Sequence, residues 1–214
     1  MAKGFNEEIQ GIYRLKVPFE KIYTSVFLVI TDSKKIMVDC ATTRDDVDRF
    51  IVPALSEQGF EMKDLDMLVL THRHGDHAGG LERVLQLAPD IAVITDIRHL
   101  AKNVSTYALA GHTADSIGIL DERTHTLISG DGILDERTHT LISGDGIQGA
   151  GVDKYRCGLK DSDAYLETLE RIKNDNRIEN ILFSHAYEPW NTEHILGRKN
   201  VRDCTEKCKE YIKK

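Results

Sequence analysis

The sequence predicts an α/β fold in which two β-sheets form a sandwich and helices lie on the outside. Two observations support it. Candidate strands and helices alternate in both halves of the chain, and the strand candidates are short apolar runs bounded by turn residues. In addition, 214 residues with 41% hydrophobic and 29% charged side chains are sufficient for one globular unit with a large core. We therefore predict a single domain over residues 1–214.

The N-terminal half begins with strands and continues into a helix. The strand candidates cover residues 11–17, 23–31 and 35–40, with a turn at 32–33. Thr43 is typical of a helix N-cap, and Gly59 is typical of a helix end. Pro53 lies inside this helix and cannot donate a backbone hydrogen bond, which predicts a kink or a split.

The remaining elements follow the same alternation. We expect a strand at 67–70, a helix at 81–88, a strand at 91–95, a β-rich stretch after residue 112, a helix at 162–173, a strand at 181–184 and a terminal helix. On the terminal helix, Val201, Cys204, Cys208 and Tyr211 form a stripe at helical spacing. A metal clip made by the two cysteines is one interpretation, and core packing is the interpretation that we favour.

Residues 71–80, Thr-His-Arg-His-Gly-Asp-His-Ala-Gly-Gly, place four metal-binding side chains within six positions. Imidazole nitrogens and a carboxylate oxygen are typical zinc ligands. His72 and His74 are two residues apart at a strand end, so they can point the same way. Gly75 is expected to permit a sharp turn that directs Asp76 and His77 toward a second ion.

This motif, placed between an apolar strand and a Gly-Gly helix start, resembles the signature of the metallo-β-lactamase-fold hydrolases. Further matches follow in the expected order: Gly111-His112-Thr113, a Ser-Gly-Asp segment and Ser184-His185. The early strand ending in Asp39 also matches, so the resemblance covers roughly residues 11 to 190. It implies an αββα four-layer sandwich of two mixed sheets flanked by helices.

The resemblance also implies a site with two Zn²⁺ ions, although iron or manganese can use the same ligands. His72, His74 and His112 would bind the first ion, and Asp76, His77 and His185 the second, with Asp145 or Asp131 as the bridge. Asp76 is in addition the candidate catalytic residue. Asp39 would orient a ligand histidine, or would be an ordinary residue of a strand-end turn. Tyr187 and Trp190 are either pocket walls or packing aromatics. We assign no role to His99 and His194, expected on helical surface, or to His125 and His139.

Two Asp candidates exist because residues 118–131 recur unchanged as residues 132–145. We interpret this as a tandem duplication of one hairpin, because a solenoid needs at least three units. The first copy can stay in place while the second forms a loop, or the reverse. Alternatively, one long hairpin uses both copies, which would put Asp131 about seven residues, or about 23 Å, from the metals. Because two of these three arrangements use Asp145, we favour it slightly.

The leading functional hypothesis is a hydrolase in which a hydroxide bridging two zinc ions attacks a small ester, thioester or lactone. The bridging Asp resembles the glyoxalase-II and lactonase branch. The alternatives are a phosphodiesterase or β-lactam hydrolase of the same fold, a mononuclear iron oxygenase acting on persulfides, and a catalytically impaired binding protein. The duplication and the short segment between His77 and His112 are the reasons for the last alternative.

Composition limits the partners. The net charge of −7 argues against nucleic acid, and there is neither a membrane-spanning run nor a signal peptide at the N-terminus. We therefore expect a cytoplasmic protein with a small-molecule substrate and no membrane partner, for which a homodimer would be unremarkable. Four cysteines without a framework pattern argue against disulfides.

Overall fold

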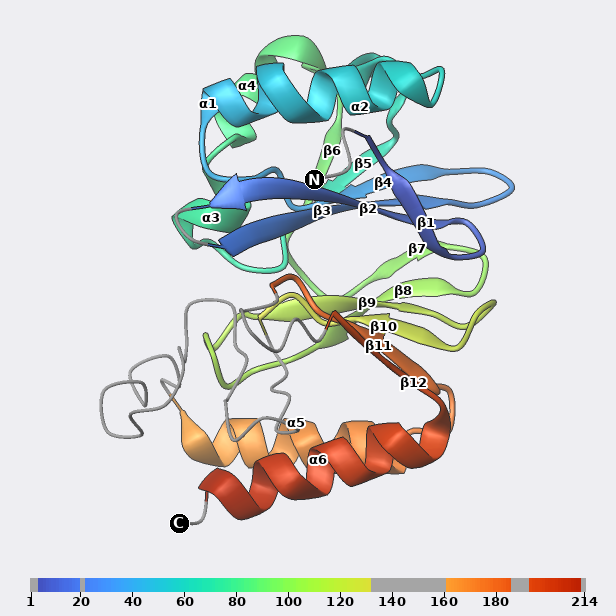
Figure 1. Ribbon diagram of the computed structural model, residues 1–214, viewed down its shortest axis with the longest axis vertical. Helices are drawn as coiled ribbons and strands as arrows, with labels where there is room; N and C mark the ends of the chain where they lie inside the picture. Colours follow the sequence, from blue (N-terminus) through green and yellow to red (C-terminus); the bar gives the residue numbers. More distant parts are fainter. Residues whose placement is uncertain (1–3, 20–21, 132–160, 186–192, 213–214) are drawn as a thin grey trace. The chain divides into compact units, whose positions relative to one another are not determined.

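The computed structural model describes residues 4–19, 22–131, 161–185 and 193–212 (Figure 1). The chain divides into two compact units, residues 1–95 and 96–214. Each unit contains one six-stranded mixed sheet together with helices, so the predicted class, two mixed sheets with flanking helices, is confirmed. The assignment of all 214 residues to one domain stays a prediction.

The sheet of the first unit has the strands in sequence order. They are β1 (Asn6–Ile9), β2 (Ile12–Phe19), β3 (Ile22–Ile30), β4 (Lys35–Val38), β5 (Met67–Val69) and β6 (Ala92–Ile94). The first four are antiparallel, whereas β4, β5 and β6 are parallel neighbours. The carboxyl ends of β4 and β5 therefore meet at one edge of the sheet, where Asp39 and the histidine motif begin.

Helices cover one face of this sheet (Figure 1). They are α1 (Arg44–Asp46), the π-helical turn η1 (Val47–Ile51), α2 (Val52–Glu57) and α4 (Leu81–Leu87), with the short η2 (Met62–Asp64) and α3 (Gly75–Ala78) between strands. Thr43 caps α1 as predicted, accepting from the Asp46 amide at 3.1 Å. The predicted split at Pro53 is present: the π-turn ends there, and the Val52 amide bonds to the Val47 carbonyl.

The core of the first unit lies between this sheet face and the helices. Leu28, Met37 and Leu68 of the sheet and Ile51 and Leu55 of the helices are fully buried in it. Each such side chain contributes roughly 1.5–3 kcal/mol by leaving water. The loops at the carboxyl ends of β4 and β5 are thus anchored to a rigid base.

The second unit has the sheet order β12-β11-β10-β9-β8-β7. Its elements are β7 (His99–Ala101), β8 (Val104–Ala108), β9 (Ile117–Asp121), β10 (Thr126–Ile128), α5 (Ser162–Asn174), β11 (Asn180–Leu182), β12 (His194–Leu196) and α6 (Arg198–Ile212). β8 and β10 are both antiparallel to β9, and β10 is parallel to β11. The carboxyl ends of β8, β10 and β11 therefore share one edge, and the segments carrying His112, Asp131 and His185 follow them.

Helices α5 and α6 pack side by side on this second sheet (Figure 1). Val201, Cys204 and Cys208 of α6 are buried among apolar side chains, so core packing is confirmed for them. The side chain of Tyr211 lies outside the described residues. The Arg198 guanidinium is half-buried and donates to the carbonyls of Ile172 at 3.2 Å and Ile178 at 2.9 Å, near the end of α5.

Four of the described strands were not predicted: β1, β7, β8 and β12. Two of them correct the expectation for His99 and His194, which are exposed but lie in strands β7 and β12 rather than on helices.

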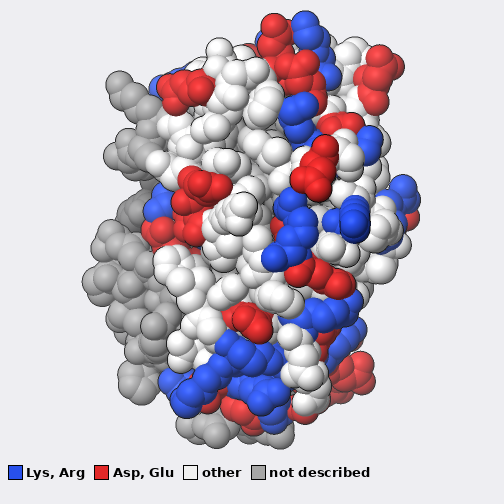
Figure 2. All heavy atoms as spheres, turned by 90° about the vertical axis from the view of Figure 1, so that its right-hand side faces the viewer, with Lys and Arg blue, Asp and Glu red and all other residues white. Residues whose placement is uncertain are grey.

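The exposed charges of the protein are mixed, because acidic and basic side chains are neighbours over much of the face in Figure 2. Among the described residues, no helix has the length and apolar character needed to cross a bilayer.

Candidate metal centre

The first half of the site starts at the sheet edge where β4 and β5 end. Asp39 follows β4 and has a positive φ of 61°, a conformation that few residues other than glycine adopt. Its amide bonds to the Val69 carbonyl of β5 at 2.9 Å. This bond extends the parallel pairing by one residue and points the Asp39 carboxylate toward the start of the histidine motif.

The Asp39 carboxylate is fully buried and accepts three hydrogen bonds. The Thr71 amide donates to Oδ1 at 2.8 Å, and the Thr71 hydroxyl donates to Oδ2 at 2.8 Å. His77 Nδ1 lies 2.7 Å from Oδ2. A carboxylate can only accept, so His77 carries its proton on Nδ1 and its Nε2 is left as a donor atom for a metal. Asp39 therefore has the orienting geometry that the sequence suggested.

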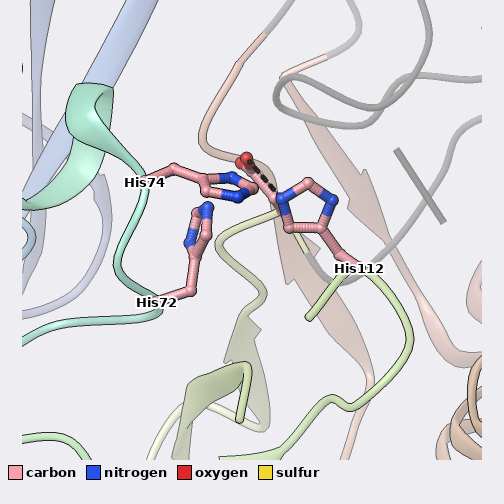
Figure 3. Close-up of side chains that lie close together, drawn as sticks. His72, His74 and His112 are labelled. Atoms are coloured by element: carbon pink, nitrogen blue, oxygen red, sulfur yellow. Dashed lines mark ion pairs between the residues drawn. The ribbon is translucent and has the colours of Figure 1, made fainter. Parts of the chain in front are cut away.

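The four side chains of the motif converge within this unit. The rings of His72 and His74 lie edge to face with centroids 4.6 Å apart (Figure 3). The ring centroids of His72 and His77 are 4.3 Å apart. His77 Nε2 is 3.2 Å from Asp76 Oδ2. One ring nitrogen of His72 lies within 4.8 Å of one ring nitrogen of His74. A carboxylate oxygen of Asp76 lies within the same distance of a ring nitrogen of His77. His72, Asp76 and His77 are buried, and Arg73 is exposed.

The turn into α3 does not depend on Gly75, contrary to expectation. Gly75 has no positive φ, and an added Cβ would meet no atom within 4 Å. His74 is the N-cap residue of α3, and its carbonyl accepts from the amides of His77 and Ala78. The glycine that the fold requires is Gly79, where a Cβ would lie 1.8 Å from the Thr42 carbonyl oxygen. Close approach of α3 to residues 40–42 is what positions His77 beside Asp39.

The second half of the site lies within the second unit. Asp131 Oδ2 is 3.7 Å from His112 Nε2, the pair marked by the dashed line in Figure 3, and Asp131 Oδ1 is 3.5 Å from His185 Nε2. All three side chains are almost completely buried. Each oxygen of the Asp131 carboxylate thus faces a different histidine.

Hydrogen bonds hold the loop that carries His112. The Thr113 amide donates to Ser116 Oγ at 3.1 Å, and the two hydroxyls are 2.7 Å apart. On the other side, Thr168 of α5 donates to the Ala110 carbonyl at 2.8 Å. Gly111 has a φ of 143° and lies against Tyr165, which leaves no room for a side chain. The Gly-His-Thr triplet is therefore a rigid turn packed on α5.

The repeated segment contributes its first copy to the described sheet. β9 and β10 are antiparallel strands from the first copy, and Asp131 follows them beside His112 and His185. The third arrangement, one long hairpin that would place Asp131 far from the metals, is therefore not formed by residues 118–131. Asp145, which the sequence slightly favoured, lies outside the described residues, as do Tyr187, Trp190 and His139. His125 is exposed in the turn after β9, and its Nδ1 is 3.2 Å from the Arg177 carbonyl.

One buried nucleophile candidate near the first half-site is inert. Cys40 donates through Sγ to the His77 carbonyl at 3.3 Å, and its amide bonds the same oxygen. Burial, together with the neighbouring Asp39 charge, raises the pKa of the Cys40 thiol from 9.0 to about 12. The thiol therefore stays protonated at neutral pH and is unsuited to attack or metal binding.

The donor set fits a divalent metal. Imidazole nitrogens whose other ring nitrogen is hydrogen-bonded, together with buried carboxylates, are the ligand chemistry of zinc and iron sites. A cluster of solvated charges would not need buried partners such as Asp39 and Thr71 to fix the orientation of the His77 and His72 rings. The signal missed in the sequence was Thr71, which stands directly before His72 at the end of β5.

Comparison with known proteins agrees with this geometry. Residues 21–103, which include Asp39 and the complete histidine motif, match the family model described as metallo-beta-lactamase superfamily. Residues 21–103 therefore match a metallo-beta-lactamase superfamily domain. Solved structures of the fold superimpose over nearly all of the chain. A metallo-beta-lactamase family protein of Thermus thermophilus has a TM-score of 0.67 at 16% identity, covering 97% of this chain and 81% of that one.

Two further solved structures superimpose on this chain. The metallo-beta-lactamase FIM-1 of Pseudomonas aeruginosa, solved in a mono-zinc form, has a TM-score of 0.67 at 16% identity and covers 97% and 98% of the two chains. The rubredoxin oxygen:oxidoreductase of Desulfovibrio gigas has a TM-score of 0.70 at 16% identity, covering 98% of this chain and 61% of that one. At these identities the likeness shows the fold alone.

The curated relatives of this chain match it over only part of their length. A beta-lactamase-like protein 2 homolog of Caenorhabditis elegans is 29% identical over 181 residues, 74% of this chain and 55% of that protein. An anti-Pycsar protein of Saccharibacillus brassicae is 38% identical over 63 residues, 29% of this chain and 23% of that protein. The chain thus spans between about a quarter and about half of the length of these relatives.

Proposed function

We propose that this chain is a dinuclear zinc-dependent hydrolase of a small ester, thioester or lactone. The observation that carries the proposal is Asp131, whose two carboxylate oxygens each face a different buried histidine. Such a carboxylate suits a ligand shared by two ions. Support also comes from the superfamily, which consists largely of metal-dependent hydrolases, and from the His and Asp clusters of this chain.

In this proposal the ligands divide into two sets. His72, His74 and His112 would hold the first ion, and Asp76, His77 and His185 would hold the second, with Asp131 as the shared ligand. When bound, two zinc ions lower the pKa of a water molecule toward neutrality and polarise the bond that is cleaved. Asp39 keeps the proton of His77 on Nδ1, so that Nε2 remains a lone-pair donor. Asp76 is the candidate for accepting a proton during the reaction, because its carboxylate is buried next to His77.

Metal content and turnover test this proposal together. We expect about two zinc ions per chain by elemental analysis after purification without added metal or chelator, and hydrolysis of a panel of p-nitrophenyl esters, thioesters and lactones. His72→Ala and His185→Ala should each lower both quantities. His99→Ala is the matched control, because His99 is exposed in β7, and it should change neither. A preparation with two zinc ions but no turnover of any panel member would contradict the hydrolase assignment, and one iron ion with oxygen consumption would replace it.

A phosphodiester is the second candidate substrate class. The Ribonuclease Z of Clostridium botulinum is 32% identical to this chain over 69 residues, 32% of this chain and 20% of that enzyme. Hydrolysis of bis-p-nitrophenyl phosphate in preference to the ester panel would favour this class. Binding of a short RNA that does not weaken as salt rises would argue against a nucleic acid as the natural substrate, because phosphate contacts make binding depend on salt.

A further inference from the structure

We propose that Thr71 is a positioning residue that links Asp39 to His72, so that one carboxylate orients a histidine of each proposed ion site. Thr71 Oγ1 lies between two partners. It is 2.8 Å from Asp39 Oδ2 and 3.1 Å from His72 Nδ1. This inference rests on the proposed metal centre for its consequence, but not for its geometry, which lies entirely within residues 39–77 of the first unit.

The direction of the two hydrogen bonds follows from counting protons. A hydroxyl has one hydrogen, and Asp39 as a carboxylate can only accept, so the Thr71 hydrogen points to Asp39. Toward His72 the Thr71 oxygen can then only accept. His72 must therefore carry its proton on Nδ1, which leaves Nε2 as its lone-pair nitrogen.

The backbone makes the hydroxyl placement rigid. The Thr71 amide donates to Asp39 Oδ1 while the hydroxyl of the same residue donates to Oδ2, so the carboxylate is held at two points. Thr71 is 1% exposed and Asp39 is completely buried, so water does not compete for these bonds. His77 Nδ1 completes the set at 2.7 Å from Oδ2.

The two histidines therefore depend on Asp39 in different ways. His77 contacts the carboxylate directly, whereas His72 depends on it through the Thr71 hydroxyl. Removing that hydroxyl should release His72 alone, while removing the carboxylate should release both rings. Loss of such a supporting partner typically lowers metal affinity about 10–100-fold.

The first test reads the histidine tautomers in metal-free protein, by long-range proton–nitrogen NMR at a pH where the rings are neutral. We expect Nδ1–H for His72 and His77 in the wild type. In Thr71→Val, His72 should lose this preference and His77 should keep it, whereas Thr71→Ser should restore the wild-type pattern. Thr126→Val is the control, because Thr126 is equally buried in β10 and its hydroxyl bonds only to the Thr124 carbonyl.

The second test titrates Zn²⁺ against a competing chelator. Thr71→Val should weaken one of two zinc equivalents about 10–100-fold, and Asp39→Ala should weaken both. The proposal is overturned if wild-type His72 carries its proton on Nε2, a result that needs no variant to fold. It is also overturned if folded Thr71→Val keeps both the tautomer and the affinity. The expected tautomers in a wild-type protein that takes up no metal would instead leave Thr71 as assigned and remove the proposed function.

Discussion

The substitution Gly79→Ala should destabilise the protein strongly, whereas Gly75→Ala, four residues earlier in the same segment, should not. A Cβ on Gly79 would lie 1.8 Å from the Thr42 oxygen and 2.4 Å from the Gly75 oxygen, both backbone atoms. Contacts below 3.0 Å are essentially never adopted, so Thr42 and α3 must separate by about 1.2 Å. Backbone bonds tie both sides of this contact, since Cys40 donates to the His77 carbonyl at 2.7 Å and Gly80 to Ala41 at 3.3 Å.

Overpacking that moves backbone costs typically about 1–3 kcal/mol and occasionally more, so we expect a loss of about 3 kcal/mol for Gly79→Ala. At Gly75 a Cβ meets nothing within 4 Å, and alanine in a helix is favoured by about 0.5–1 kcal/mol over glycine. The assay is urea unfolding followed by circular dichroism, with the free energy obtained by linear extrapolation. Unfolding midpoints within error of each other for the two variants would refute the argument from close approach.

Three other predictions concern separate parts of the chain. Asp131→Ala should remove bound metal while Asp145→Ala leaves the metal content unchanged, as measured by elemental analysis; the opposite result would assign the site to the second copy. Arg198→Ala should lower the free energy of unfolding by about 1.5–3 kcal/mol, measured by thermal unfolding, because a charged donor to the end of α5 is lost. Lys199 is exposed and paired with Asp203, so Lys199→Ala should cost less than about 0.5 kcal/mol. Cys40 should resist iodoacetamide at pH 8 until urea unfolds the protein. Because the pKa of its thiol is raised to about 12 in the folded protein, the stability that it contributes is complete below pH 9 and is lost as pH rises toward 12. Urea unfolding at graded pH should therefore show a falling free energy of unfolding over this range.

The parts of the fold that could be predicted are those with strong local signals. The apolar run of β5, the Thr43 cap and the break at Pro53 each depend on neighbouring residues, and each is present in the structure. Strand β1 was missed because it is short and has one apolar side chain, and β12 because it has only three residues, so the pairing of both depends on the neighbouring strand rather than on their own sequence.

The candidate site shows the same division. The four candidate ligands of the motif lie within six positions of the sequence, so their grouping was visible, and Asp39 was identified through the family pattern. Thr71 was missed because its role depends on the parallel register of β4 and β5, which brings a residue 32 positions away into contact. The choice between Asp131 and Asp145 could not be made, because identical segments have identical local preferences and only their distant partners differ.

The division of the chain into two units has a consequence for how damage to this protein can be repaired. Asp39 and Thr71, which orient His72 and His77, are contained in residues 1–95, whereas the supports of His112 and the partners of Asp131 come from residues 96–214. A lesion that misorients His77 should therefore be suppressed by second changes in the first unit, and one that misplaces Asp131 by changes in the second. In a genetic screen, revertants would then sort by the unit in which the original defect arose.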